Sequence, residues 1–353
     1  MRRPVSKVSR RSLLLAAAGG VIAAPMAIKS SRAASNTVTI TGWGGNYQEI
    51  FVRDAFNPFT EETGIKVNVV QSPDLARVKV QILTGNVEWD VFDGADIMIA
   101  SGSKSGFWEK LDGSVFKLDD MRIPPTSDSV PTYLFAAGLA WDPAKFGDGK
   151  HPQTFAEFFD IAKFPGRRSL MNRAFMTLEV ALLADGVAPK DVYPLDLDRA
   201  FKALDRIKPS IATWASTNTQ TIALVQTGEV DFTFTPAASR VKSTTEDGGG
   251  RPLAFSFEQN LYGSGALAVL KGTPNKENAI KLLTYIMRPE VQARLSESLG
   301  LLPVSKSAAT MLTDAARRWL PNWNNPKSLF VDPGYWADHL EPVTARFKEW
   351  VLS

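Results

Sequence analysis

Short runs of β-branched and apolar residues alternate with amphipathic segments between residues 37 and 95. In the amphipathic segments the large apolar side chains recur every three or four residues, which is typical of a helix with one buried face. Gly64 and Gly85 follow these segments, and glycine commonly ends a helix. The order predicts a βαβαβ unit with a mostly parallel sheet. We expect strands at 37–41, 65–70 and 89–92, a helix capped by Asn46 that runs to Gly64, and a helix at 75–83.

The pattern changes after the proline-rich stretch 124–131. Residues 133–141 form a long apolar run that predicts a buried strand leaving the first unit, and a strand at 265–270 carries the chain back. Between and after them we expect strands at 211–214 and 230–235 and helices at 155–162, 176–185, 198–207, 217–226, 275–287 and 289–299.

The residues after the N-terminal segment number about 320, which exceeds what one hydrophobic core usually organises. We therefore expect two α/β lobes joined by the two crossing strands. The first lobe comprises residues 35–136 and 266–353, and we expect its last 50 residues to wrap the outside as helices. The second lobe comprises residues 137–265.

Residues 1–34 combine a basic head, a modest apolar middle and a small-residue end, which is the pattern of a secretory signal peptide. Arg10 and Arg11 stand directly before a serine and three leucines, as in the twin-arginine export motif. We expect export by the twin-arginine translocase, cleavage after Ala33 or Ala34, and a periplasmic location. An ordinary Sec signal that contains two arginines is the alternative. Because the chain has no cysteine for lipid attachment, we expect a soluble mature protein.

The composition narrows the classes of function. The chain has 40 basic and 37 acidic residues, and seven of the basic ones precede residue 34. The mature protein therefore has 33 basic against 37 acidic residues, and this mildly acidic balance does not suggest nucleic acid. There is no cysteine, and His151 and His339 are the only histidines, so we expect no metal site and no cofactor. Neither histidine lies beside a serine motif, and we expect no catalytic residues and no enzyme.

Five fragments, in this order, resemble extracellular solute-binding proteins of ABC importers. The likeness runs from about residue 37 to residue 308 and is closest to the spermidine/putrescine-binding branch. The fragments are FTEETGIKV at 59–67, GEVD at 228–231, NAIKLL at 278–283, RPEVQ at 288–292 and LLPV at 301–304.

The resemblance implies the two-lobed periplasmic-binding-protein fold, type II-like, with two crossing hinge strands and a ligand cleft between the lobes. It also implies the function of a substrate-binding component of an ABC transporter. Such a protein closes around a small-molecule ligand, and the closed form is what an inner-membrane permease recognises. We expect a monomer.

Ligands of parallel α/β sheets sit beyond the carboxyl ends of the strands, and two such ends in the first lobe carry candidate residues. After the first strand come Trp43, Gly44, Asn46 and Tyr47, where the indole can stack on an alkyl chain or an ammonium group. Packing of Trp43 in the core, with glycines that only turn the chain, is the alternative.

The third strand ends at Asp93 and Asp96, whose carboxylates can pair with a ligand amine. Capping of the next helix is the favoured role for Asp96.

In the second lobe the resemblance breaks down at the ligand site. The polyamine-binding branch places acidic residues there, whereas those positions fall on Arg173 and Met176 in this chain, and on Gly263 and Gly265 near the returning strand. An arginine suits a carboxylate, a sulfonate or a phosphonate through paired hydrogen bonds. Solvation of the Arg173 side chain is the alternative. The further candidates for ligand contact are Arg240 and Tyr262.

The sequence therefore predicts a binding protein for a small solute with an anionic group and an amine, such as an amino acid of the γ-aminobutyrate type. Three alternatives remain open. The first is a true polyamine-binding protein that uses Asp93, Asp96 and Trp43. The second is a periplasmic enzyme exported by the twin-arginine route. The third is a protein that only presents its ligand to a chemoreceptor.

Overall fold

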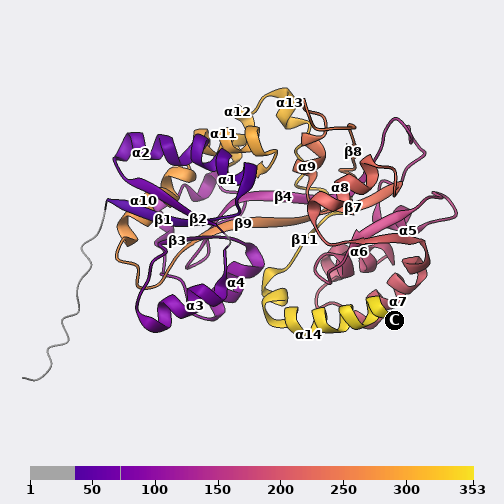
Figure 1. Cartoon of the computed structure of the whole chain (residues 1–353), viewed down its shortest axis with the longest axis horizontal. Coiled ribbons are helices and arrows are strands. Elements are labelled where there is room, and N and C mark those ends of the chain that lie inside the picture. Colours follow the sequence, from indigo (N-terminus) through magenta and orange to yellow (C-terminus); the bar gives the residue numbers. More distant parts are fainter. Residues whose placement is uncertain (1–35, 72) are drawn as a thin grey trace, which may run out of the picture. The chain divides into compact units, whose positions relative to one another are not determined.

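The computed structural model describes residues 36–71 and 73–353 (Figure 1). The predicted signal peptide, with Arg10, Arg11 and the cleavage site, lies outside these described residues. None of the helices in the described ranges has the length and apolar character that crossing a membrane requires.

The described residues form one mixed sheet of eleven strands, which confirms the predicted α/β class. Its main path runs in the order β2 (Lys66–Gln71), β1 (Thr37–Gly42), β3 (Val91–Ala95), β9 (Leu261–Val269), β4 (Val130–Trp141), β7 (Phe232–Thr235), β5 (Arg168–Met171) and β6 (Ile211–Ala215). Strands β2, β1 and β3 pair in parallel, as the βαβαβ pattern predicts. Three short strands lie off this path: β8 (Ala254–Phe255), β10 (Leu302–Pro303) and β11 (Leu329–Phe330).

Two long strands, β4 and β9, run through the middle of the molecule and connect its two halves (Figure 1). Residues 130–137 of β4 pair with β9, and its last four residues pair with β7 of the second lobe. Both strands are almost fully buried, and the apolar character of β4 explains why the sequence predicts it as a long continuous run. The predicted returning strand begins four residues too late, at residue 265, because Gly263 and Gly265 interrupt the apolar pattern.

Helices cover both faces of the sheet in each lobe. Around the first lobe lie α1 (Gly45–Phe51), a π-helical turn (Val52–Phe56), α2 (Asn57–Thr63), α3 (Leu75–Thr84), α4 (Asp96–Lys104), α10 (Lys276–Ile286) and α11 (Pro289–Leu299), followed by α12 (Lys306–Met311) and α13 (Asp314–Arg317). Around the second lie α5 (Phe155–Phe159), α6 (Thr177–Ala184), α7 (Leu197–Ile207), α8 (Asn218–Gln226) and α9 (Ala238–Ser243). Short 3₁₀ turns occupy Gly113–Val115, Leu118–Asp120, Pro189–Asp191 and Lys208–Ser210.

The last helix, α14 (Pro333–Leu352), packs its apolar side chains into the core of the second lobe. Trp336, Val343 and Phe347 are buried there, and the Phe347 ring lies 6.0 Å from that of Trp214. The sequence-based boundaries assign this segment to the first lobe. The spacing of its aromatic residues predicts a helix but carries no information on which lobe receives it.

Two local predictions differ from the structure. Asn46 is not the N-cap of α1, because Gly44 occupies that position and the helix begins at Gly45. Gly44 and Gly45 have φ of +72° and +54°, which only glycine adopts at little cost, so the helix begins two residues earlier than predicted. β5 is not predicted at all. It begins with the fully buried Arg168, whose guanidinium donates to backbone carbonyls, and the pattern marks an arginine as exposed.

Candidate functional site

The strand register places the carboxyl ends of the two lobes' parallel strands opposite each other. β3 ends at Ala95, which is level with Gly265 of β9 and therefore with Tyr133 of β4. β7 runs in the opposite direction and ends at Thr235, which is level with Gly138 of β4. Five residues of β4 separate these two levels, or roughly 17 Å at the usual rise of a strand. Such an interval, between facing strand ends, suits a small solute.

Two aromatic side chains of β4 occupy this interval, and both lie over glycines of β9. A Cβ on Gly265 would stand 2.1 Å from the ring of Tyr133, and one on Gly263 would stand 2.4 Å from the ring of Phe135. The glycines therefore let the two rings lie against the backbone of β9. Tyr133 and Phe135 are not among the residues that the sequence predicts for the site. The signal that could have found them is the Gly-x-Gly pattern opposite an aromatic-x-aromatic pattern in two buried strands.

The loop after β1 carries the first group of predicted residues. Trp43 is 45% exposed, so it does not pack in the core. Asn46 is exposed on the first turn of α1, whereas Tyr47 is half-buried and its ring lies 5.9 Å from that of Tyr133. Gly44 makes the turn that brings Tyr47 against the sheet.

Asp93, in the middle of β3, is only 3% exposed. Its Oδ2 accepts a hydrogen bond of 2.9 Å from the hydroxyl of Tyr47. Its Oδ1 is also buried and has no hydrogen-bond partner among the described residues. Burial raises the pKa of Asp93 to about 7, and the side chains of Tyr47 and Trp43 oppose this rise only in part. The carboxyl group is therefore suited to receive a donor from a bound molecule.

Asp96, the first residue of α4, uses both of its oxygens within the protein. Oδ1 accepts a hydrogen bond of 2.8 Å from the amide of Ile97, and Oδ2 accepts one of 2.9 Å from the amide of Ser264 in β9. Burial raises the pKa of Asp96 to about 6. The N-cap position itself is held by Ala95. Asp96 therefore fastens the start of α4 to β9, a structural role close to the favoured capping role.

Arg173 lies two residues beyond the carboxyl end of β5. Its guanidinium lies 5.7 Å from the centre of the Phe175 ring, and its buried Nε has no hydrogen-bond partner among the described residues. Burial lowers the pKa of Arg173, and the charge of Glu179 opposes this effect. Met176, at the end of the same loop, has φ of +68°, a strained conformation for a residue with a side chain. Strain of this kind is often found at binding sites.

Buried contacts hold the Arg173 loop against the start of α14. The Phe175 ring lies 5.5 Å from that of Trp336, whose indole donates a hydrogen bond of 2.6 Å to the buried carboxylate of Glu179. On the other side of α14, Lys104 of α4 donates to the carbonyl of Gly334 at 3.1 Å. The helix that begins at the β3 end and the loop that follows β5 therefore meet at the same short segment of α14.

The two remaining candidates lie elsewhere. Arg240 is exposed on α9, which follows the carboxyl end of β7. Tyr262 alternates with Gly263 along β9, so its side chain projects from the face opposite Tyr133 and Phe135. Its hydroxyl donates to the carbonyl of Asn322 at 3.1 Å, and its ring packs on Trp323. The structure therefore brings Trp43, Tyr47 and Asp93 together and does not add Tyr262 to them.

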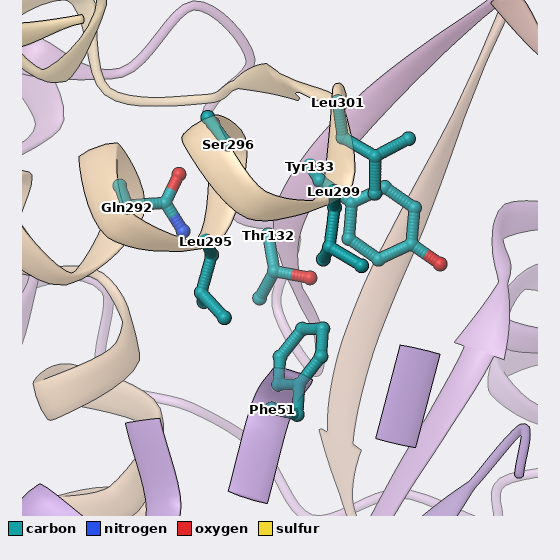
Figure 2. A pocket seen from close by; sticks show the side chains of 8 residues that line it. All are labelled: Phe51, Thr132, Tyr133, Gln292, Leu295, Ser296, Leu299 and Leu301. Carbon is teal, nitrogen blue, oxygen red and sulfur yellow. The ribbon is translucent and has the colours of Figure 1, made fainter. Parts of the chain in front are cut away.

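Two pockets in the described residues lie outside the facing strand ends. The first, of about 10 Å³, lies behind Tyr133 and holds no more than about one water molecule (Figure 2). The second, of about 370 Å³, lies on the second lobe. Its charged groups pair with each other, Lys163 with Glu157 at 3.1 Å and Lys327 with Glu258 at 3.9 Å. Neither pocket offers an uncompensated charge for a polar solute. The described residues contain no cluster of acids or histidines that could hold a metal ion.

Comparison with known proteins identifies the family. Residues 54–323 match the model of the bacterial extracellular solute-binding protein family. A gamma-aminobutyric acid-binding protein of Pseudomonas aeruginosa is 32% identical over 331 residues, which cover 91% of this chain and 92% of that protein. A spermidine/putrescine-binding periplasmic protein of Salmonella typhimurium is 24% identical, covering 86% of this chain and 88% of that protein. A solved structure of a GABA receptor has 30% identity and a TM-score of 0.80, covering 89% of this chain and 97% of that one.

These relatives confirm the predicted two-lobed fold of periplasmic binding proteins and the periplasmic location. Proteins of this kind bind small molecules and deliver them to a membrane permease of an ABC transporter. The family match covers most of the described residues. A solute-binding function is consistent with a sheet in which two sets of strand ends face each other. The chain belongs to the bacterial extracellular solute-binding protein family.

Proposed function

We propose that the protein captures a small solute carrying both an ammonium and an anionic group, such as γ-aminobutyrate, and passes it to an inner-membrane ABC permease. One observation carries the proposal. A buried acid, Asp93, lies at one of the two facing sets of strand ends, and an arginine, Arg173, lies at the other. Each has a buried polar atom without a hydrogen-bond partner among the described residues. Asp93 then receives the ammonium group, and Arg173 receives the anionic group. The GABA-binding relatives support this choice of solute.

A polyamine fits these residues less well. It carries only positive charges, so its second ammonium group would lie against Arg173. Burial of two like charges without a counter-charge costs several kcal/mol, on the order of the effective penalty for an unpaired buried ion. The positions opposite Tyr133 and Phe135 are glycines, so β9 supplies no further acid there. The polyamine-binding relatives are also less similar to this chain than the GABA-binding relative is.

We further propose that the protein acts by binding alone, as a monomer exported by the twin-arginine translocase, and not as an enzyme. Both histidines make packing contacts that support a structural role. His151 stacks on Trp141 with ring centres 3.7 Å apart, and His339 stacks on Tyr335 at 4.3 Å. Turnover of a solute by the purified protein would contradict this part of the proposal.

Isothermal titration calorimetry with three probes tests the choice of solute. γ-Aminobutyrate carries both charges, butanoate lacks the ammonium group, and putrescine lacks the carboxylate. We expect γ-aminobutyrate to bind most tightly. Tight binding of putrescine with no binding of ω-amino acids of two to five methylene groups would contradict the proposal.

Substitution of Arg173 by glutamine tests the site of the anionic group. Loss of a charge-assisted pair should weaken γ-aminobutyrate at least about tenfold and affect putrescine much less. Arg346→Gln is the matched control, since this exposed arginine pairs with Asp198 on the outside of the second lobe. If Arg240→Gln has the large effect and Arg173→Gln none, the anionic group lies at α9 instead.

A further inference from the structure

Asp93 differs from the other buried acids of the first lobe in what surrounds it. Asp90, which is equally buried, accepts hydrogen bonds from the amide of Thr39 at 2.7 Å and from Asn275 at 3.2 Å. Asp96 has a donor on each oxygen. Asp93 accepts one hydrogen bond, from Tyr47, and its Oδ1 has no hydrogen-bond partner among the described residues, although the side chain of Trp43 lies close enough to lower the pKa of the carboxyl group.

No cation is paired with Asp93 in the described part of the chain, and its titratable neighbours are all acids or phenols. Tyr47 of α1 donates to it, Tyr133 of β4 lies against Tyr47, and Asp96 begins the next helix. The pKa values of Tyr47 and Tyr133 are raised by burial and by the charge of Asp93, so both phenols stay protonated. The surroundings can therefore donate one hydrogen bond to the carboxylate but cannot neutralise it.

The exposed Trp43 gives a route to this buried group. Its indole lies near enough to Asp93 to influence the carboxyl group, while 45% of its surface remains in contact with solvent. An ammonium group that slides along the indole face would be attracted by the ring and would arrive at the free oxygen. The Tyr133 ring, which lies over Gly265, is 5.9 Å from the ring of Tyr47, whose hydroxyl donates to Asp93.

We infer that the free oxygen of Asp93 accepts the ammonium group of the solute, and that capture of the solute releases a proton from this carboxyl group. The inference rests on the proposed function, because it assigns one half of the same site. In the empty site the carboxyl group is about half protonated at neutral pH and largely protonated below it, which spares the cost of an unpaired buried charge. The arriving ammonium group stabilises the carboxylate, and the proton leaves to solvent. Protons and solute therefore compete for Asp93.

Calorimetric titration of the purified protein with γ-aminobutyrate between pH 7.5 and pH 5.5 tests the coupling. The ammonium group of the probe stays charged throughout this range. We expect the dissociation constant to rise roughly 20- to 30-fold from pH 7.5 to pH 5.5, as a single competing proton with a pKa near 7 requires. Titrations at pH 6.5 in two buffers of different ionisation enthalpy should show release of about half to one proton per bound solute.

Two variants and a second probe separate the possible causes. Asp93→Asn should bind γ-aminobutyrate at least about tenfold more weakly at pH 7.5 and with little dependence on pH. Asp96→Asn, a buried acid whose oxygens already have donors, should keep the pH dependence. Butanoate, which lacks the ammonium group, should cause no proton release, and this comparison in the unaltered protein remains decisive if Asp93→Asn does not fold.

Tight binding of γ-aminobutyrate without proton release overturns the inference and leaves the proposed function standing. Equal affinities of Asp93→Asn and the unaltered protein overturn the inference and the placing of the ammonium group at Asp93, while the capture of the solute itself still stands. Failure of the unaltered protein to bind any ω-amino acid at pH 7.5 overturns both.

Discussion

Asp93 and Arg173 each keep a buried polar atom without a hydrogen-bond partner among the described residues, as Arg122 and Glu179 also do. Most charged groups in the described residues have a counter-ion or hydrogen-bond donors; Asp231, for example, lies between Lys145 and Arg167. Leaving a buried polar atom without a hydrogen-bond partner costs about 1–3 kcal/mol. The unpartnered atoms of Asp93 and Arg173 therefore lower the free energy of unfolding. We interpret this loss of stability as the consequence of keeping both atoms free to bind the solute.

Because burial raises the pKa of Asp93, we predict that this residue makes the stability of the protein depend on pH. Its pKa is 3.8 in the unfolded chain and about 7 in the folded protein. Between these values the folded state binds more protons, so the free energy of unfolding falls as the pH rises from about 4 to about 7. Asp93→Asn has no carboxyl group at this position, so its free energy of unfolding does not fall in this way. The free energy of unfolding of the variant, minus that of the unaltered protein, should increase by about 2–3 kcal/mol from pH 5 to pH 8. The contribution of Asp96 cancels because both proteins contain it.

Denaturant melts at the two pH values measure this difference. Asp90→Asn is the control. Asp90 accepts hydrogen bonds from Thr39 and Asn275, so this substitution should destabilise the protein by about 1–3 kcal/mol at both pH values. Identical pH profiles for Asp93→Asn and the unaltered protein would contradict the assignment of a raised pKa to Asp93.

At the scale of elements, β4 and β9 form the floor of the site because glycines of one strand lie beneath aromatic rings of the other. The arrangement predicts that Gly265→Ala displaces the Tyr133 ring, since the added Cβ would stand 2.1 Å from it. We expect a loss of about 1–3 kcal/mol of stability, as for other overpacked positions, and weaker binding of γ-aminobutyrate. Gly113→Ala is the matched control, because its Cβ meets nothing within 4 Å. Unchanged melting and affinity in Gly265→Ala would show that Tyr133 does not depend on this contact.

The sequence predicts most elements because their apolar patterns are long and regular, as in β4. It fails where tertiary contacts decide the outcome. β5 escapes prediction because Arg168 is buried among backbone carbonyls, and the lobe that receives α14 depends on contacts such as Trp336 with Glu179. Within the proposed site, the loop with Trp43 and the carboxyl of Asp93 follow from the expectation of ligand contacts at strand ends, although β3 continues two residues past Asp93. Tyr133 and Phe135 do not, because their role depends on cross-strand register that no local pattern reveals.

At the scale of the whole molecule, the two lobes are linked by β4 and β9, and at the start of α14 by contacts of modest strength. Lys104 of α4 pairs there with Asp338 of α14, but both side chains are exposed, and such pairs contribute about 0–1 kcal/mol. We therefore expect the lobes to close when the solute bridges Asp93 and Arg173. Small-angle X-ray scattering should show a smaller radius of gyration in saturating γ-aminobutyrate. An unchanged radius in the presence of bound solute would contradict closure.

The central claim is that one small solute with two opposite charges bridges the facing strand ends. A crystal structure of the complex with γ-aminobutyrate tests it most directly. We predict the ammonium nitrogen at hydrogen-bond distance, about 2.7–3.0 Å, from the free oxygen of Asp93, and the carboxylate on the guanidinium of Arg173. A solute bound in the second-lobe pocket beside Lys163 and Glu157, or one whose ammonium group lies against any acid other than Asp93, would contradict the claim.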